Sequence, residues 1–204
     1  MPFKPPRPPR GRAALAGLCT SLLVLGAAPA LAAASCPQAS TSKVFSRFGD
    51  EAAYSVVTGG SFEAGTAGWT LSNAAVASGN ESYSVAGGSH SLAIRPNGSA
   101  ITPVICVSSE NPSFRLFVRR TSGTWAVLNA IVRWTDASGV THETESGAIS
   151  TNGTSWALSS KLALGSMLPL WQRGETLSVR IVFRPEASGG ALAIDDLYVD
   201  PYRK

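Results

Sequence analysis

From about residue 54 onward, apolar and polar positions alternate in the manner of short β-strands. In segment 113–121, Phe114, Leu116 and Val118 are two positions apart and share one face. Helical periodicity is weak, and Gly, Ser and Thr separate the apolar runs. The runs typical of strands are 54–57, 89–96, 100–108, 113–121, 127–136, 140–150, 154–164, 175–185 and 191–200. Many short strands separated by turn residues predict an all-β domain, a β-sandwich or a barrel.

Two runs form a predicted hairpin, because only the turn residues Ala137, Ser138 and Gly139 separate 127–136 from 140–150. A break is expected at Pro96–Gly98. Phe62 and Trp69, in the glycine-rich stretch before the second run, are expected to enter the core. The first and last strands are expected to be neighbours although they are distant in sequence.

The first 34 residues have the features of a secretory signal peptide. Four basic residues and no acid precede an apolar run that ends in small residues. Its most apolar part, 13–28, is shorter than the ~20 residues of a membrane span, which argues against a membrane anchor. The chain therefore divides into a signal peptide (1–34), a lead-in (35–54) and one β-sandwich domain (55–204), and the mature protein is expected to be secreted.

Removal of the signal peptide changes the charge balance. Of the 17 Lys and Arg residues, 13 remain, against 13 Asp and Glu. A chain with no net charge lacks the basic excess that nucleic-acid binding requires. Nucleic acid is therefore excluded as the expected partner.

The cysteines agree with export. Cys19 leaves with the signal peptide, and Cys36 and Cys106 remain as an even pair, which in a secreted chain predicts a disulfide. The alternative is lipid attachment at Cys36. Ala33 stands where lipoproteins usually carry leucine, and lipidation would leave Cys106 without its partner, so the disulfide is favoured.

Three motifs occur in an order that resembles a known family. "GGSFEAGTAGW" (59–69) opens the domain, "GGSHSLAI" (87–94) follows, and "ALAIDDLYVDP" (191–201) closes it. This order is similar to that of the jelly-roll, galactose-binding-like carbohydrate-binding modules of secreted bacterial proteins. The resemblance covers most of residues 55–201 and implies a β-sandwich jelly roll, because similarity in so diverse a family concerns fold more than ligand.

The resemblance also implies a structural calcium ion, held by Glu63 and Asp195, with Asp196 as the alternative ligand. Calcium takes six to eight oxygen ligands, main-chain carbonyls included, so oxygens near Ser61 and Ser89 are expected to contribute. The competing interpretation is that Glu63 pairs with an arginine or faces water.

A sugar-binding face needs aromatic rings and polar side chains. Trp125 and Trp171 are expected on loops, and each tryptophan has a core role as its alternative. Arginines form a second set that would build a basic face if their strands share one sheet, and such a face would suit an acidic glycan. The alternative is that they pair with acids. These arginines are Arg115, Arg119, Arg133, Arg180 and Arg184.

The expected function is non-catalytic binding of a polysaccharide or cell-surface glycan. The alternative is an extracellular or cell-envelope interaction or structural domain, with a cell-surface protein as partner and no sugar binding. Catalysis is a third hypothesis, since Glu143 and Glu145 share a strand face at a spacing that suits paired carboxylates. Hairpin strands commonly carry such acids on a solvated face, and this interpretation is favoured over catalysis.

Overall fold

The computed structural model describes residues 40–108, 113–164, 168 and 176–200. The predicted signal peptide, Cys36 and Trp171 lie outside these residues, so the disulfide between Cys36 and Cys106 stays a prediction. No helix in the described segments is long and apolar enough to cross a membrane.

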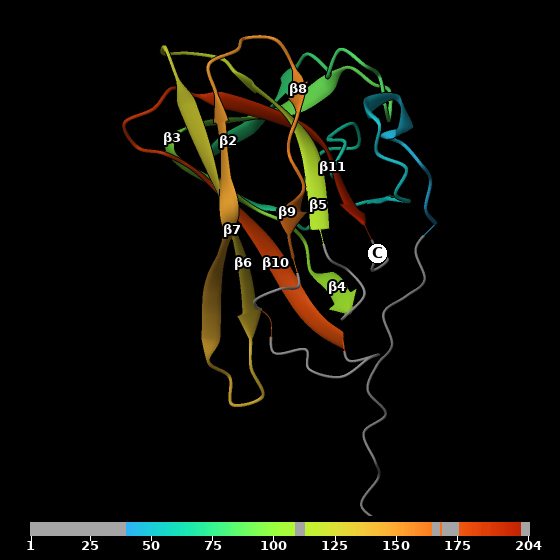
Figure 1. Ribbon diagram of the computed structural model, residues 1–204. Coiled ribbons are helices and arrows are strands. Elements are labelled where there is room, and N and C mark those ends of the chain that lie inside the picture. Colours follow the sequence, from blue (N-terminus) through green and yellow to red (C-terminus); the bar gives the residue numbers. More distant parts are fainter. Residues whose placement is uncertain (1–39, 109–112, 165–167, 169–175, 201–204) are drawn as a thin grey trace, which may run out of the picture. The chain divides into compact units, whose positions relative to one another are not determined.

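The described residues form antiparallel strands and one short 3₁₀ helix, η1 (Ser46–Phe48). The strands are β1 (Ser55–Val56), β2 (Thr70–Ser78), β3 (His90–Ile101), β4 (Ile105–Ser108), β5 (Ser113–Arg120), β6 (Ala126–Thr135), β7 (Thr141–Thr151), β8 (Ala157–Leu158), β9 (Leu162–Ala163), β10 (Thr176–Pro185) and β11 (Leu192–Asp200). The predicted hairpin is β6–β7 (Figure 1).

The sheet order is β7-β6-β10-β3-β11-β5-β8, and β3 connects its two halves. The start of β3 pairs with β11, and its end pairs with β10. Between these parts the backbone bends at Asn97, which has a φ of 59°, and at Gly98, where a Cβ would lie 2.8 Å from the carbonyl oxygen of Asn73. The expected break at 96–98 is thus a bend inside one strand, which passes from one layer to the other.

The two layers enclose the apolar core of a β-sandwich. Phe114 on β5 and Phe183 on β10 come from different layers and meet edge to face, with ring centroids 6.2 Å apart. Phe62 and Trp69 join this core with centroids 5.1 Å apart, which confirms their predicted place. The all-β jelly-roll prediction is confirmed, as is the pairing of the first and last strands, β1 and β11.

Two stretches differ from the predicted strands. Segment 70–78 forms β2 although its Ala, Ser and Asn residues have low strand propensity, since pairing with β3 overrides propensity. Segment 154–164 contributes only the two-residue strands β8 and β9, both paired with β5.

The lead-in covers the outer face of β5. Phe117, which alternation places outward, is fully buried there, because it packs against Phe45 with centroids 6.0 Å apart. Tyr54 and Tyr198 also contact the Phe45 ring, and these residues form a second apolar cluster. The face of this layer is therefore occupied by the protein's own N-terminal segment.

Asp50 fastens the lead-in to the sheet. Its buried carboxylate accepts hydrogen bonds from Tyr54 Oη (2.6 Å) and Arg115 Nη1 (2.9 Å), and Lys161 Nζ lies at 2.9 Å. Burial alone would raise the pKa of Asp50, but these bonds outweigh it and hold the pKa well below 3.8.

We expect Asp50→Ala to lower the free energy of unfolding by about 3–5 kcal/mol, because Arg115 would lose its buried partner. Urea denaturation measures the change, and Glu51→Ala, which removes an exposed ion pair with Lys43, is the matched control. Equal losses in the Asp50 and Glu51 variants would contradict the role of Asp50 in fastening the lead-in.

The wild type should also lose stability in acid. A carboxyl with a lowered folded pKa stabilises the fold above its unfolded pKa, so the free energy of unfolding should fall as the pH drops below 3.8.

Candidate functional site

The outer face of β7, β6 and β10 is the part of the described surface that best resembles a ligand site. Alternation along β6 sends Leu128 and Val132 into the core and presents Asn129, Ile131 and Arg133 outward. On β10 the same rule presents Arg184 outward. These side chains lie side by side because the strands pair in register.

Glu143 on β7 is held between two arginines. Its Oε1 accepts hydrogen bonds from Arg133 Nε (2.8 Å) and Arg133 Nη2 (2.5 Å). Arg184 donates from Nη1 to Oε2 at 3.2 Å and from Nη2 to Oε1 at 3.1 Å. The bonds from Arg184 and Arg133 keep the pKa of Glu143 below its usual value. The arrangement fixes three long side chains in a flat polar cluster.

A shallow depression of about 360 Å³ opens beside this cluster. Ile131 provides its apolar part, and Glu145 stands opposite Ile131 in the strand register. Asn129 Nδ2 donates to Glu186 Oε2 at 3.4 Å. The depression is lined by Asn129, Ile131, Glu143, Glu145 and Arg184. None of these lining residues is aromatic.

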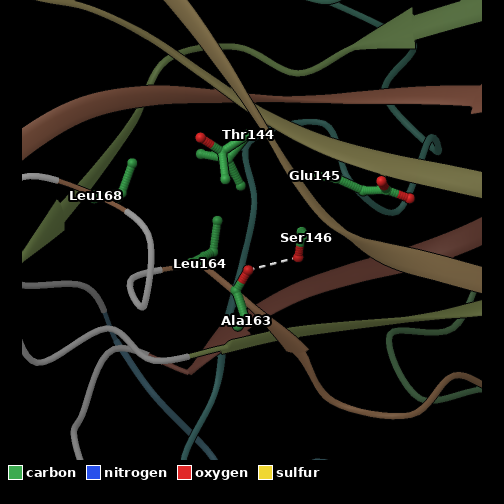
Figure 2. Close-up of a pocket in the computed structure, with 7 residues that line it drawn as sticks. Thr144, Glu145, Ser146, Ala163, Leu164 and Leu168 are labelled. Atoms are coloured by element: carbon green, nitrogen blue, oxygen red, sulfur yellow. Dashed lines mark hydrogen bonds between the residues drawn. The ribbon is translucent and has the colours of Figure 1, made fainter.

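A β-bulge in β7 shapes the rim of the face. The register shifts between Ala130 and Ile131, and the extra residue, Ser146, turns inward to donate a hydrogen bond to the carbonyl of Ala163 at 2.5 Å. Figure 2 shows Ser146 directed at Ala163 while Glu145 extends away from them. The cavity on the inner side is about 30 Å³, too small for a sugar ring.

The arginines singled out in the sequence do not share one face. Arg133, Arg180 and Arg184 belong to the β6–β10 layer, and Arg180 Nη1 donates to the carbonyl of Thr102 at 2.6 Å. Arg115 lies in the other layer, where Asp50 and the Ser159 carbonyl bind it. Arg119 also lies in that layer.

The aromatic candidates are dispersed as well. Trp125 is exposed, whereas Trp134 is half-buried and stacks on His142 with centroids 5.2 Å apart. Trp156 is buried beneath the guanidinium of Arg119, 4.8 Å from its ring centroid. Trp171 lies outside the described residues.

Among the described residues, Glu63 pairs with His90 and with no arginine. Its Oε1 accepts main-chain hydrogen bonds from Ser89 (2.9 Å) and His90 (2.6 Å), and its Oε2 lies 3.1 Å from His90 Nδ1. The His90 side chain contributes most to lowering the pKa of Glu63. Glu63 therefore ties the glycine-rich opening turn to the start of β3.

Asp195 and Asp196 are buried near a third acid, Glu81, which is 2% exposed. Burial, with the neighbouring acids adding to it, raises the pKa of Asp195 to about 7 and that of Asp196 to about 6. Asp195 Oδ2 accepts from Glu81 N at 2.9 Å, and Asp196 Oδ2 accepts from Ala86 N at 3.0 Å. Within the part of the chain that the structure describes, the buried Oδ1 of Asp196 has no hydrogen-bond partner.

Sequence reasoning missed Glu81, Asn129 and Ile131. The alternation of β6 carries a signal for the last two, because polar Asn129 and Arg133 flank Ile131 on one face. Glu81 lies in a turn-rich stretch with no periodic pattern, so no local signal marks it as buried.

The sequence matches no family model and no curated protein. Solved structures do share the fold. The CBM22-1 xylan-binding domain of Paenibacillus barcinonensis Xyn10C superposes with a TM-score of 0.53 at 18% identity, over 71% of this chain and 92% of that chain. The CBM22-2 xylan-binding domain of the same protein gives 0.50 at 12% identity, over 70% and 97%.

A third structure comprises the CBM22-1 and GH10 modules of Clostridium thermocellum Xyn10B with xylohexaose. It gives a TM-score of 0.53 at 11% identity, over 69% of this chain and 27% of that chain. At such identities the likeness establishes the jelly-roll fold, and this fold is shared with carbohydrate-binding modules.

We expect Gly88→Ala to destabilise the domain by about 2–4 kcal/mol. The backbone φ at Gly88 is 123°, and a Cβ there would lie 2.2 Å from Glu63 Cδ, so Glu63 would have to leave its hydrogen bonds. The control is Gly87→Ala, where φ is 74° and nothing lies within 4 Å of the added atom. Thermal denaturation compares the two, and equal melting temperatures would contradict the role assigned to Glu63.

Proposed function

We propose that this protein is a secreted, non-catalytic carbohydrate-binding module whose β7–β6–β10 face binds a neutral polysaccharide. The observation that carries the proposal is the depression beside Glu143, where fixed guanidinium, carboxylate and amide groups surround apolar Ile131. Sugar hydroxyls both donate and accept hydrogen bonds, so a face with both kinds of partner suits them. The predicted signal peptide supports secretion.

The charge of the face favours a neutral chain over an acidic one. Arg133 and Arg184 are the basic groups, and Glu143, as their shared partner, offsets one of their two positive charges. Glu145 and Glu186 add further negative charge beside the depression. A carboxylate-bearing polymer would meet repulsion here rather than an unpaired cation.

The same contacts argue against Glu143 as the general acid of a glycoside hydrolase. A general acid for that reaction needs a raised pKa, so that it is protonated near neutral pH. Arg184 and Arg133 lower the pKa of Glu143 instead. The ion-paired carboxylate is suited to positioning side chains and not to donating a proton.

We expect the protein to sediment with an insoluble neutral polysaccharide such as xylan and to be released by soluble oligosaccharides of the same chain. Glu143→Gln and Arg184→Ala should each weaken binding by about tenfold or more, since each breaks the fixed cluster. Arg95→Ala, at an exposed residue of β3, is the matched control and should bind normally.

Depletion and calorimetric titration measure these affinities. No binding across a panel of neutral and acidic polysaccharides would reject the proposal and favour the alternative, an extracellular interaction domain without sugar binding. Tight binding of an acidic polymer alone would reject the neutral class.

We also propose that Asp195, Asp196 and Glu63 support a structural calcium ion. No group of three or more His, Cys, Asp or Glu side chains within the described residues is arranged to hold a metal alone, so main-chain oxygens would have to complete the site. What favours calcium is the buried Asp196 Oδ1, which has no hydrogen-bond partner among the described residues, together with the burial and the neighbouring acids that raise the pKa of Asp195 and of Asp196. A divalent cation would neutralise this charge and hold the closing strand to the opening turn.

We expect calcium to raise the melting temperature at pH 8 by about 5–10 °C when it is present at a hundred times its dissociation constant. The effect should shrink at pH 5, where Asp195 and Asp196 hold protons.

The protein without calcium should show its own pH dependence. A carboxyl whose folded pKa exceeds its unfolded pKa destabilises the fold as pH rises between the two values. The free energy of unfolding of the chelated protein should therefore fall from about pH 4 to 7. Asp196→Asn should remove the calcium response and Glu51→Gln should keep it. A melt that calcium and chelator leave unchanged would reject the site.

A further inference from the structure

Trp125 continues the outward row of β6 beyond the depression. Ala126, the next residue, is buried in the core. Two main-chain hydrogen bonds connect this segment to the turn after β10. Gly190 N donates to the Trp125 carbonyl and Glu186 N donates to the Val127 carbonyl, each at 2.8 Å. When the carbonyls of residues i and i+2 point to the same neighbouring segment, the chain between them is extended. In an extended chain such residues share a face, so the Trp125 side chain lies on the same outer face as Val127.

The β10–β11 turn gives Trp125 a flat support. A Cβ on Gly189 would lie 3.3 Å from Cζ3 of the indole, so glycine lets the ring approach the backbone closely. A Cβ on Gly190 would lie 1.8 Å from the Ser122 carbonyl oxygen, which excludes any side chain there. Trp125 remains 38% exposed, so the indole is held in place and still accessible to a ligand.

The row that results is long and combines different chemistries. From Trp125 to Arg133 the strand rises about 3.3 Å per residue, or about 26 Å in all. Asn129 and Ile131 lie between these ends on the same face, and Glu186 connects the turn to Asn129. The depression lacks an aromatic lining residue, and Trp125, just before β6, provides one on the same outer face.

We propose that Trp125 is the aromatic platform of an extended subsite, and that the ligand is a linear oligosaccharide of several rings lying along β6. This inference rests on the proposed function. A ring at one end of the chain stacks its C–H face on the indole, while rings at the other end exchange hydrogen bonds with Glu143, Arg184 and Asn129. Affinity therefore grows with chain length until the ligand spans from Arg133 to Trp125.

The test compares a disaccharide with a hexasaccharide of the neutral polysaccharide that the sedimentation assay selects, by calorimetric titration. Trp125→Ala weakens hexasaccharide binding by at least about tenfold, or about 1.4 kcal/mol, and leaves disaccharide binding within about twofold. Trp125→Phe retains most of the affinity, because a ring is still present. Val140→Ala, at an exposed apolar residue on the β6–β7 turn, is the control. Tryptophan fluorescence changes with the hexasaccharide in the wild type and loses this response in Trp125→Phe.

The outcomes separate this subsite from the proposed function. If Glu143→Gln weakens binding while Trp125→Ala binds the hexasaccharide like the wild type, the subsite is rejected and the depression stands. If Trp125→Ala weakens both ligands equally, the length dependence is absent and the extended subsite is again rejected. If the wild type binds no polysaccharide, both proposals fall.

Discussion

The pairing of β3 with both β10 and β11 is the constraint on which the architecture depends. A strand that pairs with one layer at its start and the other at its end has to bend, and the bend requires the positive φ of Asn97 and the missing side chain of Gly98. Because the strand crosses between layers, the apolar faces of β5 and β10 are brought together, and Phe114 meets Phe183. The outer faces of the two layers then become separate surfaces with separate chemistry.

The layers use their outer faces differently. The β5 layer is covered by the lead-in, whose Asp50 draws Arg115 into a buried ion pair. No described segment covers the Glu143 cluster on the β6–β10 layer, where Arg133 and Arg184 share Glu143 at the surface. Burial makes the first pair essential for stability, while exposure leaves the second group able to exchange hydrogen bonds with a ligand. The same residue type therefore serves the fold on one side and the candidate site on the other.

The opening and closing motifs act on the fold and not on the candidate site. Glu63 binds the amides at the start of β3, and β11 places Asp195 and Asp196 in the interior beside Glu81. Burial and neighbouring acids raise the pKa of Asp195 and of Asp196, so ionising these two carboxyls is unfavourable, and a cation would relieve this. This end lies in the β11 layer, whereas the depression belongs to β6, β7 and β10.

The sequence by itself determined most of the strand pattern, the hairpin and the core positions of Phe62 and Trp69, since alternation and turn residues act over short distances. The jelly-roll class followed from the resemblance of the opening and closing motifs to a known family. It also placed Glu143 and Glu145 on one strand face. Tertiary structure alone decided which arginines share a surface, because layer membership follows from pairings between distant strands. It also decided that Phe117 is buried and that Glu143 is ion-paired, since both depend on neighbours far along the chain. Local sequence encodes which way a side chain points, and only the folded sheet decides what it meets.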